Sequence, residues 1–313
     1  MTTKTSKEIA IQQFEHCWID ADHNREALEY MNLAHRMSGS SPFNFVVAGK
    51  PGAGKTSLCK KVKSLIPSVE MGELTTRPVV HVQMSSGATV PVLLKQLLKD
   101  IGQTKTKGLR HDDQKELLFT QLKCCETKLI LLDEFQQLVR KNNRDFNDRV
   151  CDFIKELSRE TRISIGLIGV PKGLKLFELD EHLTSRFSSP IILPELDHRS
   201  GVTFQYFQEF LVKLLEQYPL KTSKLTSDNN AARLWMASKG NLRTLKKILI
   251  VAANLFYEPK YHPLTIEEIK IAYSFVYNKK IPEFYGANGH PVHPFESEIQ
   301  TIRRYLHDHA GIK

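Results

Sequence analysis

Several features are scarce in this sequence of 313 residues, and each scarcity excludes a class of protein. The five cysteines include no C-x-x-C pair, so neither a disulfide framework nor a zinc site is indicated, and a reducing compartment is expected. No apolar run is long enough to span a bilayer, and the first residues lack the apolar core of a signal peptide. No internal repeat is found. We therefore expect a cytoplasmic protein without a membrane partner.

The charge of the chain is unbalanced, because 44 lysines and arginines outnumber 35 acidic residues and leave a net charge of +9. Such an excess favours a polyanionic partner, with nucleic acid ahead of a membrane surface. The hydrophobic content of 41% is that of an ordinary globular protein. Since many soluble proteins are simply basic, the charge alone is a weak indication of nucleic-acid binding.

One stretch organises the chain: an apolar segment at 43–48, a glycine-rich turn and the start of a helix. The turn at 49–56 matches the pattern G-x-x-x-x-G-K-[ST]. Its glycines allow backbone N–H groups to form an anion-binding nest, and the helix dipole adds positive potential. We expect Lys55 to reach the β- and γ-phosphates of ATP and the Thr56 hydroxyl to ligate Mg²⁺. The predicted ATP-binding residues of this stretch are Gly49, Lys50, Pro51, Gly52, Ala53, Gly54, Lys55, Thr56 and Ser57.

A second apolar run, at 129–132, ends in two acidic residues. This pattern is typical of a buried parallel strand whose carboxyl end enters a site. By itself such an ending is weak, but downstream of a P-loop it indicates a hydrolytic pair. We expect Asp133 to hold Mg²⁺ and Glu134 to act as general base on the attacking water.

Strands and helices alternate between residues 42 and 195, which predicts a parallel sheet covered by helices on both faces. The five expected strands are 43–48, 79–84, 129–134, 163–169 and 189–193, and a turn is expected at 73–78. After residue 195 only helical periodicity remains, with helices expected at 203–218, 227–238, 242–256 and 265–276. Asn241 and Thr265 are the expected N-caps of the last two. We expect four parts: an N-terminal helical segment (1–41), an α/β domain (42–195), a helical domain (196–278) and a tail (279–313). The tail is rich in proline, glycine and histidine, so we expect it to begin as a loop and to end in a helix.

The segment 102–110 is polar, basic and contains glycines near both ends, which predicts a loop. One interpretation is a solvated surface loop, because charged loops are usually only solvated. The other is that Lys105, Lys107 and Arg110 contact the phosphate backbone of double-stranded DNA. If they do not, the next candidates are Arg140, Lys141 and Arg144.

A P-loop α/β domain followed by a helical lid resembles the AAA+ ATPases. The segment L-T-S-R-F at 183–187 resembles the box that holds an arginine finger, which implies that Arg186 reaches the γ-phosphate on a neighbouring subunit. The segment G-N-L-R at 240–243 resembles sensor 2 of initiator-like members, which implies a nucleotide contact for Arg243. At the sensor-1 position the chain departs from the family, because Val170 has no polar side chain. Sensor 1 is therefore unassigned, and the rate of hydrolysis is open.

Within that superfamily the chain most resembles the TnsC/TniB ATPases, which are target-selection regulators of bacterial transposons. The resemblance spans roughly residues 34–256 by motif order and includes L-L-D-E-F-Q-Q-L at 131–138 and I-G-V-P at 168–171. It implies ATP-dependent self-assembly into a ring or helical filament on duplex DNA. It further implies transfer of a target site to transposase subunits and, in some systems, recruitment by a TniQ-type adaptor. The implied protein is a bacterial ATPase that uses hydrolysis as an assembly switch.

Two other functions would use the same nucleotide residues. One is an AAA+ ATPase of DNA replication or repair, such as a helicase loader or clamp-loader-like subunit. No winged-helix or zinc module is recognisable after the lid, which counts mildly against this alternative. The other is an ATPase that remodels proteins and binds no nucleic acid, against which the basic loop and the net charge both count.

Overall fold

The computed structural model describes residues 5–71, 74–104, 108–140, 143–194, 201–257, 263–278 and 283–310. The chain divides into two compact units. One contains residues 24–50 and 55–193 and is called the sheet unit; the other contains 1–23, 51–54 and 194–313 and is called the helical unit. The expected N-terminal segment 1–41 is therefore not a single part, because its first helix belongs to the helical unit and its second to the sheet unit.

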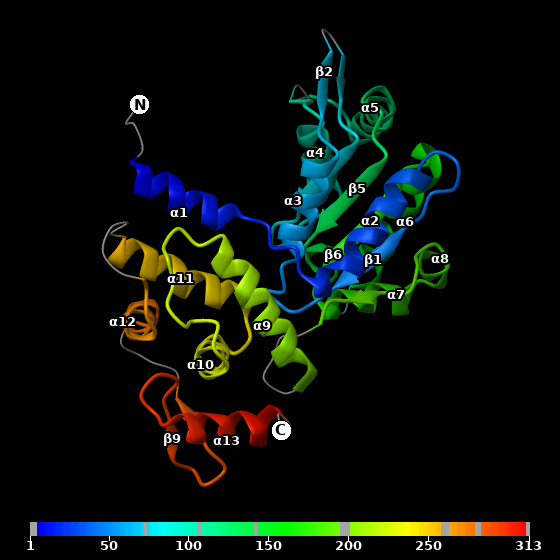
Figure 1. Ribbon diagram of the computed structural model, residues 1–313. Helices are drawn as coiled ribbons and strands as arrows, with labels where there is room; N and C mark the ends of the chain where they lie inside the picture. The colour runs from blue at the N-terminus through cyan, green and yellow to red at the C-terminus, as the bar shows by residue number, and fades with distance from the viewer. Residues whose placement is uncertain are drawn as a thin grey trace. The chain divides into compact units, whose positions relative to one another are not determined.

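The sheet unit is built on a five-stranded, all-parallel sheet (Figure 1), which confirms the predicted α/β class. Its strand order is β4-β5-β6-β1-β7. Every residue of β1, β5 and β6 is buried, which explains why these strands are almost continuously apolar. The strands are β1 (Phe45–Ala48), β4 (Val79–Gln83), β5 (Leu129–Asp133), β6 (Ser164–Gly169) and β7 (Ile191–Ile192).

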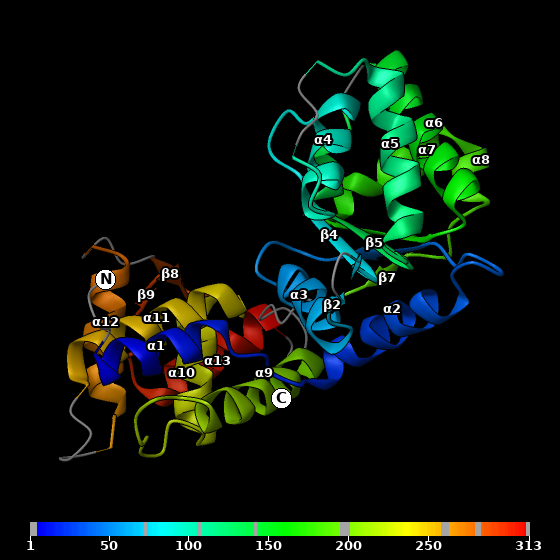
Figure 2. The same ribbon diagram turned by 90° about the horizontal axis from the view of Figure 1, so that it is seen from above.

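Helices cover both faces of this sheet (Figure 2). One face packs against α2 (Arg25–Met37) and α3 (Lys55–Leu65). The other is covered by α4 (Val90–Asp100), α5 (His111–Cys124) and α6 (Arg144–Thr161), and the leucines of α4 are buried in the core. Shorter elements complete the unit: α7 (Lys175–Leu179), α8 (Glu181–Thr184) and the 3-10 turns η2 (Phe135–Leu138) and η3 (Pro171–Leu174). A further 3-10 turn, η1 (Asp22–Asn24), spans the boundary between the two units.

The sheet register aligns the carboxyl-terminal ends of β5, β6 and β1 at the same end of the sheet. Asp133, the last residue of β5, pairs with Ile168 of β6, and Ala48 of β1 pairs with Gly169 at the end of β6. From this edge the chain continues into the glycine-rich loop, into Glu134 and into Val170. Ligands of open α/β sheets bind at this end of the strands, so the topology alone places the predicted motifs together.

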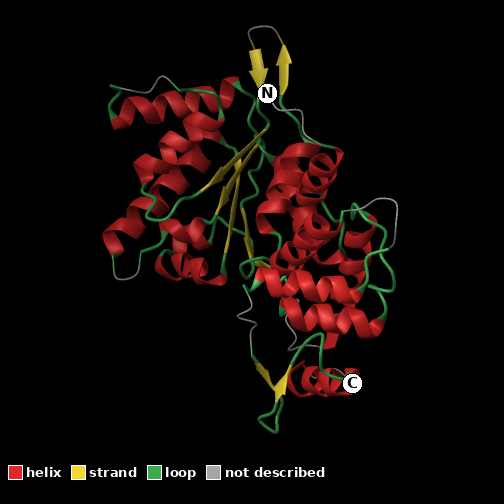
Figure 3. Cartoon of the chain, turned by 90° about the vertical axis from the view of Figure 1, so that its left-hand side faces the viewer, coloured by secondary structure: helices red, strands yellow, loops and turns green. Residues whose placement is uncertain are grey.

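A hairpin in the sheet unit departs from the sequence-based expectation. Residues 73–78 were expected to be a turn, whereas β2 (Val69–Met71) and β3 (Leu74–Thr76) form an antiparallel pair. This pair extends away from the main sheet (Figures 1 and 3). Each strand has only three residues, which is too short for an alternating pattern to stand out.

The helical unit is built from α1 (Ser6–His16), α9 (Gly201–Glu216), α10 (Asp228–Ser238), α11 (Leu242–Phe256) and α12 (Ile266–Val276). Trp235 and Tyr273 are fully buried at its centre. The predicted helix ends are confirmed: Asn241 Oδ1 accepts from the Thr244 N–H at 3.1 Å, and Thr265 forms a capping box. Among the described residues, no helix is both long and apolar enough to cross a membrane.

The tail belongs to the helical unit and is not a separate part. It forms β8 (Phe284–Tyr285), β9 (Pro291–Val292) and α13 (Ile299–Ala310), whereas its composition had indicated a loop followed by a helix. The Phe295 ring lies 5.2 Å from the ring of Tyr273, and Arg233 Nη1 donates to the Pro294 carbonyl at 2.9 Å. These contacts attach the tail to the same core that the helices form.

Candidate functional site

The glycine-rich loop joins β1 to α3, as its motif requires. The Gly49 N–H donates to the Gly169 carbonyl at 3.0 Å, which ties the start of the loop to the end of β6. Lys55 is only 5% exposed, and its Nζ donates to the carbonyls of Gly49 at 2.8 Å and Lys50 at 2.9 Å. The ammonium is therefore held inside the loop, next to the backbone amides that would face an anion.

Gly52 lies at the tip of the loop and is part of the helical unit. Only glycine fits at this position. Its φ of +89° lies in the left-handed region, and a Cβ there would overlap the side-chain amide of Asn241. Asn241 Nδ2 donates to the Pro51 carbonyl at 2.8 Å, while its Oδ1 caps α11. One side chain thus holds both the loop tip and the first turn of α11, which carries Arg243.

Asp133 is a fully buried carboxylate with a partner on each oxygen. Its Oδ2 accepts from the Thr56 hydroxyl at 2.7 Å, and its Oδ1 accepts from the Glu134 N–H at 2.9 Å. His81 Nε2 lies 3.6 Å from the same Oδ2. Burial alone would raise the pKa of Asp133, but the contacts with His81 and Thr56 outweigh it and hold the pKa below its ordinary value. The group is therefore an anion at neutral pH.

The donor atoms of Cys59, His81 and Asp133 lie within 4.8 Å of one another, so this cluster could hold a metal ion. Mg²⁺ prefers hard oxygen ligands, which the Asp133 carboxylate and the Thr56 hydroxyl supply. The Cys59 thiol does not suit Mg²⁺, because thiolates are soft ligands and burial raises the pKa of this thiol well above its ordinary value. The fit to Mg²⁺ therefore rests on Thr56 and Asp133, with His81 beside them.

Glu134 leaves β5 in the left-handed conformation, with φ 59° and ψ 37°, which is uncommon for a residue with a Cβ. Its Oε2 accepts a hydrogen bond from Gln136 Nε2. Gln136 Oε1 in turn accepts from the Val170 N–H at 3.2 Å. The carboxylate is therefore oriented by a side chain that also reaches the position where a polar sensor-1 residue was expected.

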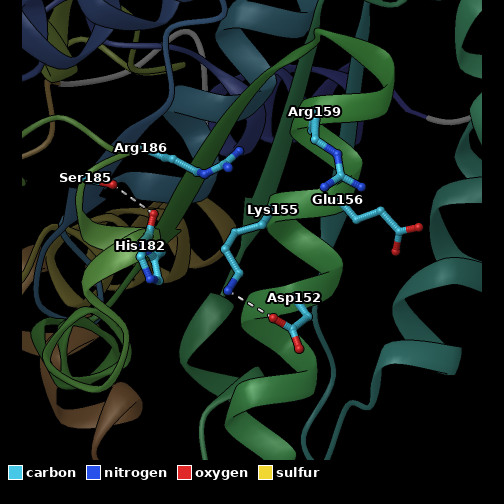
Figure 4. Close-up of a pocket in the computed structure, with 7 residues that line it drawn as sticks. All are labelled: Asp152, Lys155, Glu156, Arg159, His182, Ser185 and Arg186. Atoms are coloured by element: carbon cyan, nitrogen blue, oxygen red, sulfur yellow. Dashed lines mark hydrogen bonds and ion pairs between the residues drawn. The ribbon is translucent and has the colours of Figure 1, made fainter.

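Arg186 lies in the turn after α8 and is exposed. Its side chain extends toward α6, and among the described residues its guanidinium makes no ion pair (Figure 4). The backbone is fixed, because Asn44 Nδ2 donates to the Arg186 carbonyl at 3.2 Å and Asn44 Oδ1 accepts from the Ile165 N–H at 2.9 Å. Arg186 lines an open cavity of about 460 Å³ together with Asp152, Lys155, Glu156, Arg159, His182 and Ser185.

An ion pair joins α6 to the start of α8, the short helix that precedes Arg186. Lys155 Nζ lies 2.9 Å from Asp180 Oδ2 and 2.9 Å from Asp152 Oδ1. Asp180 Oδ1 also accepts from the Leu183 N–H at 2.8 Å and so caps α8. Burial raises the pKa of Asp180, but the bonds from Lys155 and Leu183 outweigh this and lower it.

The basic segment 102–110 is held at both ends by α5. Gln103 Nε2 donates to Gln121 Oε1 at 2.9 Å, and Gln114 Nε2 donates to the Leu109 carbonyl at 2.9 Å. Arg110 is exposed at the start of α5. Lys105 and Lys107 lie outside the described residues.

The second candidate for DNA contacts consists of Arg140, Lys141 and Arg144, of which Arg140 makes several contacts with α6. The Arg140 guanidinium stacks 4.0 Å above the Phe146 ring, and its backbone N–H and carbonyl bond the buried side chain of Asn147. Arg144 is 82% exposed at its side chain and lies 3.9 Å from Asp148. Lys141 lies outside the described residues. Of the candidate DNA contacts that the structure describes, Arg110, Arg140 and Arg144 are all exposed, and Arg140 is in addition held against Phe146.

Comparison with known protein families identifies the family of this chain. Residues 9–197, which are more than half of the chain, match the family model described as the bacterial TniB protein. The chain belongs to the TniB family. This agrees with the resemblance drawn above from the order of its motifs.

This TniB-family chain is also similar to replication initiators. Over 165 residues it is 26% identical to ORC1-type DNA replication protein 2 of Thermoplasma acidophilum, a match that covers 51% of this chain and 39% of that protein. The structure of the ORC1 protein of Aeropyrum pernix in complex with DNA matches with a TM-score of 0.58 and 16% identity, covering 88% of this chain and 72% of that one. The ADP form of the Aeropyrum pernix ORC2 protein matches with a TM-score of 0.61 and 16% identity over 84% and 72%. These likenesses show the fold, a parallel α/β domain followed by a helical region.

Three side chains of the site were missed by sequence reasoning. His81 lies between two valines in β4, and only the pairing of β4 with β5 brings it to Asp133. Gln136 was part of a recognised block but had no assigned role. Asn241 was recognised as a helix cap, whereas its bond to Pro51 depends on packing within the helical unit. A polar residue between valines was the one signal available for His81, and no comparable signal marked Gln136.

Proposed function

We propose that this chain is a DNA-binding AAA+ ATPase that binds ATP with Mg²⁺, assembles on duplex DNA and links target-site selection to a transposase. The nucleotide part is supported by one observation above all. Lys55, Thr56, Asp133 and Glu134 converge at one edge of the sheet, with Thr56 Oγ1 2.7 Å from Asp133 Oδ2. The transposition part is supported by membership of the TniB family.

Each residue has a distinct task in the proposed reaction. The loop amides and Lys55 bind the phosphates of ATP, while Thr56 and Asp133 hold Mg²⁺. Mg²⁺, when bound, neutralises charge on the β- and γ-phosphate oxygens. Glu134 orients the attacking water and accepts its proton. Arg243 contributes a contact to the same nucleotide from α11.

Arg186 is proposed to complete the site of a neighbouring subunit. Arg186 is exposed, its carbonyl is bonded by Asn44, and the start of the preceding helix α8 is joined to α6 through Asp180 and Lys155. A cation held in this way on a surface can stabilise the charge of the transition state in another subunit. Hydrolysis then requires assembly, which makes the oligomer the unit of function.

The proposed DNA contacts are Lys105, Lys107 and Arg110, one set from each subunit. The described ends of the segment support this, because Gln103 and Leu109 are hydrogen-bonded to side chains of α5 and Arg110 is exposed. Phosphate contacts carry no sequence information, so selection of the target falls to partner proteins. We propose transposase subunits and a TniQ-type adaptor as those partners.

A second candidate is an AAA+ ATPase of DNA replication or repair. It is supported by the 26% identity to an ORC1-type replication protein. Both candidates predict ATP and DNA binding, so only a transposition assay separates them.

The decisive experiment is an insertion assay in cells that carry this coding sequence, a marked element with its transposon ends, and a transposase of a TniB-type transposon. Insertions should depend on this chain and should be lost in Lys55→Ala, while the control Lys60→Ala, on the exposed side of the same helix, retains them. ATP binding of both variants is measured by calorimetry in parallel. If insertion proceeds equally without this chain, the replication or repair alternative gains and the transposition proposal fails.

A further inference from the structure

The feature that the proposed mechanism does not use is the bridge formed by Gln136. Its Nε2 donates to Glu134 Oε2, and its Oε1 accepts from the Val170 N–H at 3.2 Å. A side-chain amide has one donor end and one acceptor end. Here the donor end faces the Glu134 carboxylate and the acceptor end faces the Val170 N–H. A flipped amide would place its oxygen against the carboxylate and its NH₂ group against the N–H, and both hydrogen bonds would be lost. The bridge therefore has a single workable orientation.

The surroundings of Gln136 leave it little freedom. A Cβ at Gly169 would overlap Gln136 Oε1 and lie 2.7 Å from the Phe135 ring, so only glycine at this position admits the bridge. Phe135 is 1% exposed and also lies against Gly173. Gln136 is thus held between a packed aromatic ring and the end of β6, which suits a group that must fix another side chain.

The same end of β6 also holds the phosphate loop. The Gly169 carbonyl accepts from the Gly49 N–H at 3.0 Å, and the next residue, Val170, bonds Gln136. The start of the loop and the Glu134 carboxylate are therefore attached to two successive residues of one strand end. A polar side chain at position 170 could have made this connection, but valine cannot.

We propose that Gln136 is a positioning residue that orients Glu134 toward the attacking water and links it to the end of β6 in place of a polar sensor-1 side chain. This rests on the proposed role of Glu134 as general base. With Oε2 bonded to the amide, Oε1 is the oxygen left to accept a proton from water. The amide acts only through Glu134 and need not touch the nucleotide.

The test is single-turnover ATP hydrolysis by the full chain with DNA, comparing Gln136→Met with Gln137→Met. Methionine keeps the length of the side chain and removes both hydrogen bonds, and Gln137 is the neighbour in the same 3-10 turn. We expect Gln136→Met to bind ATP as the wild type does and to hydrolyse it ~10- to 100-fold more slowly, because misplaced catalytic groups cost about that much. Gln137→Met should hydrolyse normally.

A double-mutant cycle separates positioning from a merely structural role. In a Glu134→Gln background, Gln136→Met should cause no further loss, because the residue it acts through is gone. Equal losses in both backgrounds, or an unchanged rate in Gln136→Met, would overturn the inference. If Glu134→Gln alone leaves hydrolysis unchanged, the base assignment fails and the inference falls with it, which is a distinguishable result.

A substitution at Gly169 tests the same hydrogen bonds of Gln136 without changing Gln136 itself. Gly169→Ala places a Cβ where Gln136 Oε1 lies and should reproduce the slow hydrolysis of Gln136→Met. If Gln136→Met does not fold, Gly169→Ala and the shorter Gln136→Asn make the same comparison. Normal hydrolysis by both of these variants would contradict the inference.

Discussion

Glu134 and Asp133 are adjacent in sequence but stand in different environments. Asp133 is fully buried and bonded at both oxygens, whereas Glu134 is half-buried and bonded at one. Two neighbouring carboxylates can therefore have different tasks, one toward a metal ion and one toward water. The difference follows from the turn of the chain after β5, where Glu134 takes a positive φ.

Glu134→Gln should separate ATP binding from hydrolysis. Glutamine keeps the shape of the side chain but cannot accept the proton, so phosphate release should fall by about 100-fold or more while ATP stays bound. Phosphate release and ATP affinity are measured on the same preparation, with Glu116→Gln, at an exposed position of α5, as control. Unchanged release from the Glu134 variant would remove this residue from the role of base.

The short helix α8 depends on Asp180, which caps it and joins it to α6 through Lys155. Asp180→Ala removes the cap and should lower the free energy of unfolding by ~1 to 2 kcal/mol, the usual range for a capping residue. Asp180→Asn retains a capping oxygen and should lose less. Chemical denaturation at pH 7 compares the three proteins, and equal midpoints would show that α8 is held by other contacts.

The same pair gives a pH dependence with a defined sign. The pKa of Asp180 is lower in the folded chain than its ordinary value, because the bonds from Lys155 and Leu183 outweigh burial. Its contribution to stability is therefore complete above pH ~4, the ordinary value, and is lost as pH falls through the lowered folded value. The stability difference between wild type and Asp180→Asn should be present at pH 6 to 8 and shrink below about pH 4. A difference that grows on acidification would contradict this account.

Assembly of several copies is expected to be the condition for hydrolysis. Arg186→Ala should bind ATP but not hydrolyse it, and Lys55→Ala should do neither. Because one protein retains the P-loop and the other the finger, a mixture of the two should regain part of the activity. The control is a mixture of Lys175→Ala, an exposed site on α7, with Lys55→Ala. Absence of rescue at every ratio, with mixed oligomers verified by size, would exclude a finger that acts between subunits.

DNA binding by the assembly should be electrostatic and largely independent of sequence. With a non-hydrolysable ATP analogue, Lys105→Ala/Lys107→Ala should lower the salt slope of binding by about 1 per lost contact in each subunit. Since each subunit repeats the contact, the loss of affinity should multiply across the oligomer. A double variant of the exposed Lys60 and Lys123 serves as control. An unchanged slope would move the DNA site to Arg140, Lys141 and Arg144.

Much of the fold could be predicted from local patterns. The five parallel strands, α11 at Leu242–Phe256 and the cap at Asn241 followed from apolar runs, helical periodicity and capping chemistry. These signals are carried by residues close in sequence, because strands, turns and helix ends are formed by neighbours along the chain. The P-loop was recognisable for the same reason, since a nest of amides needs glycines only within one turn.

What the sequence left open are the contacts that join separate elements. His81 reaches Asp133 because β4 lies beside β5, and Gln136 reaches Val170 because β5 lies beside β6. The attachment of α1 and of the tail to the helical core likewise depends on which apolar faces meet, as when the Phe14 ring packs 5.0 Å from Tyr218. No local pattern encodes strand order or the choice of packing partner, because both are set by burial over the whole chain. The amino-acid order thus determined the chemistry of the phosphate loop and the acidic pair, and folding alone brought to them the side chains that hold them in place.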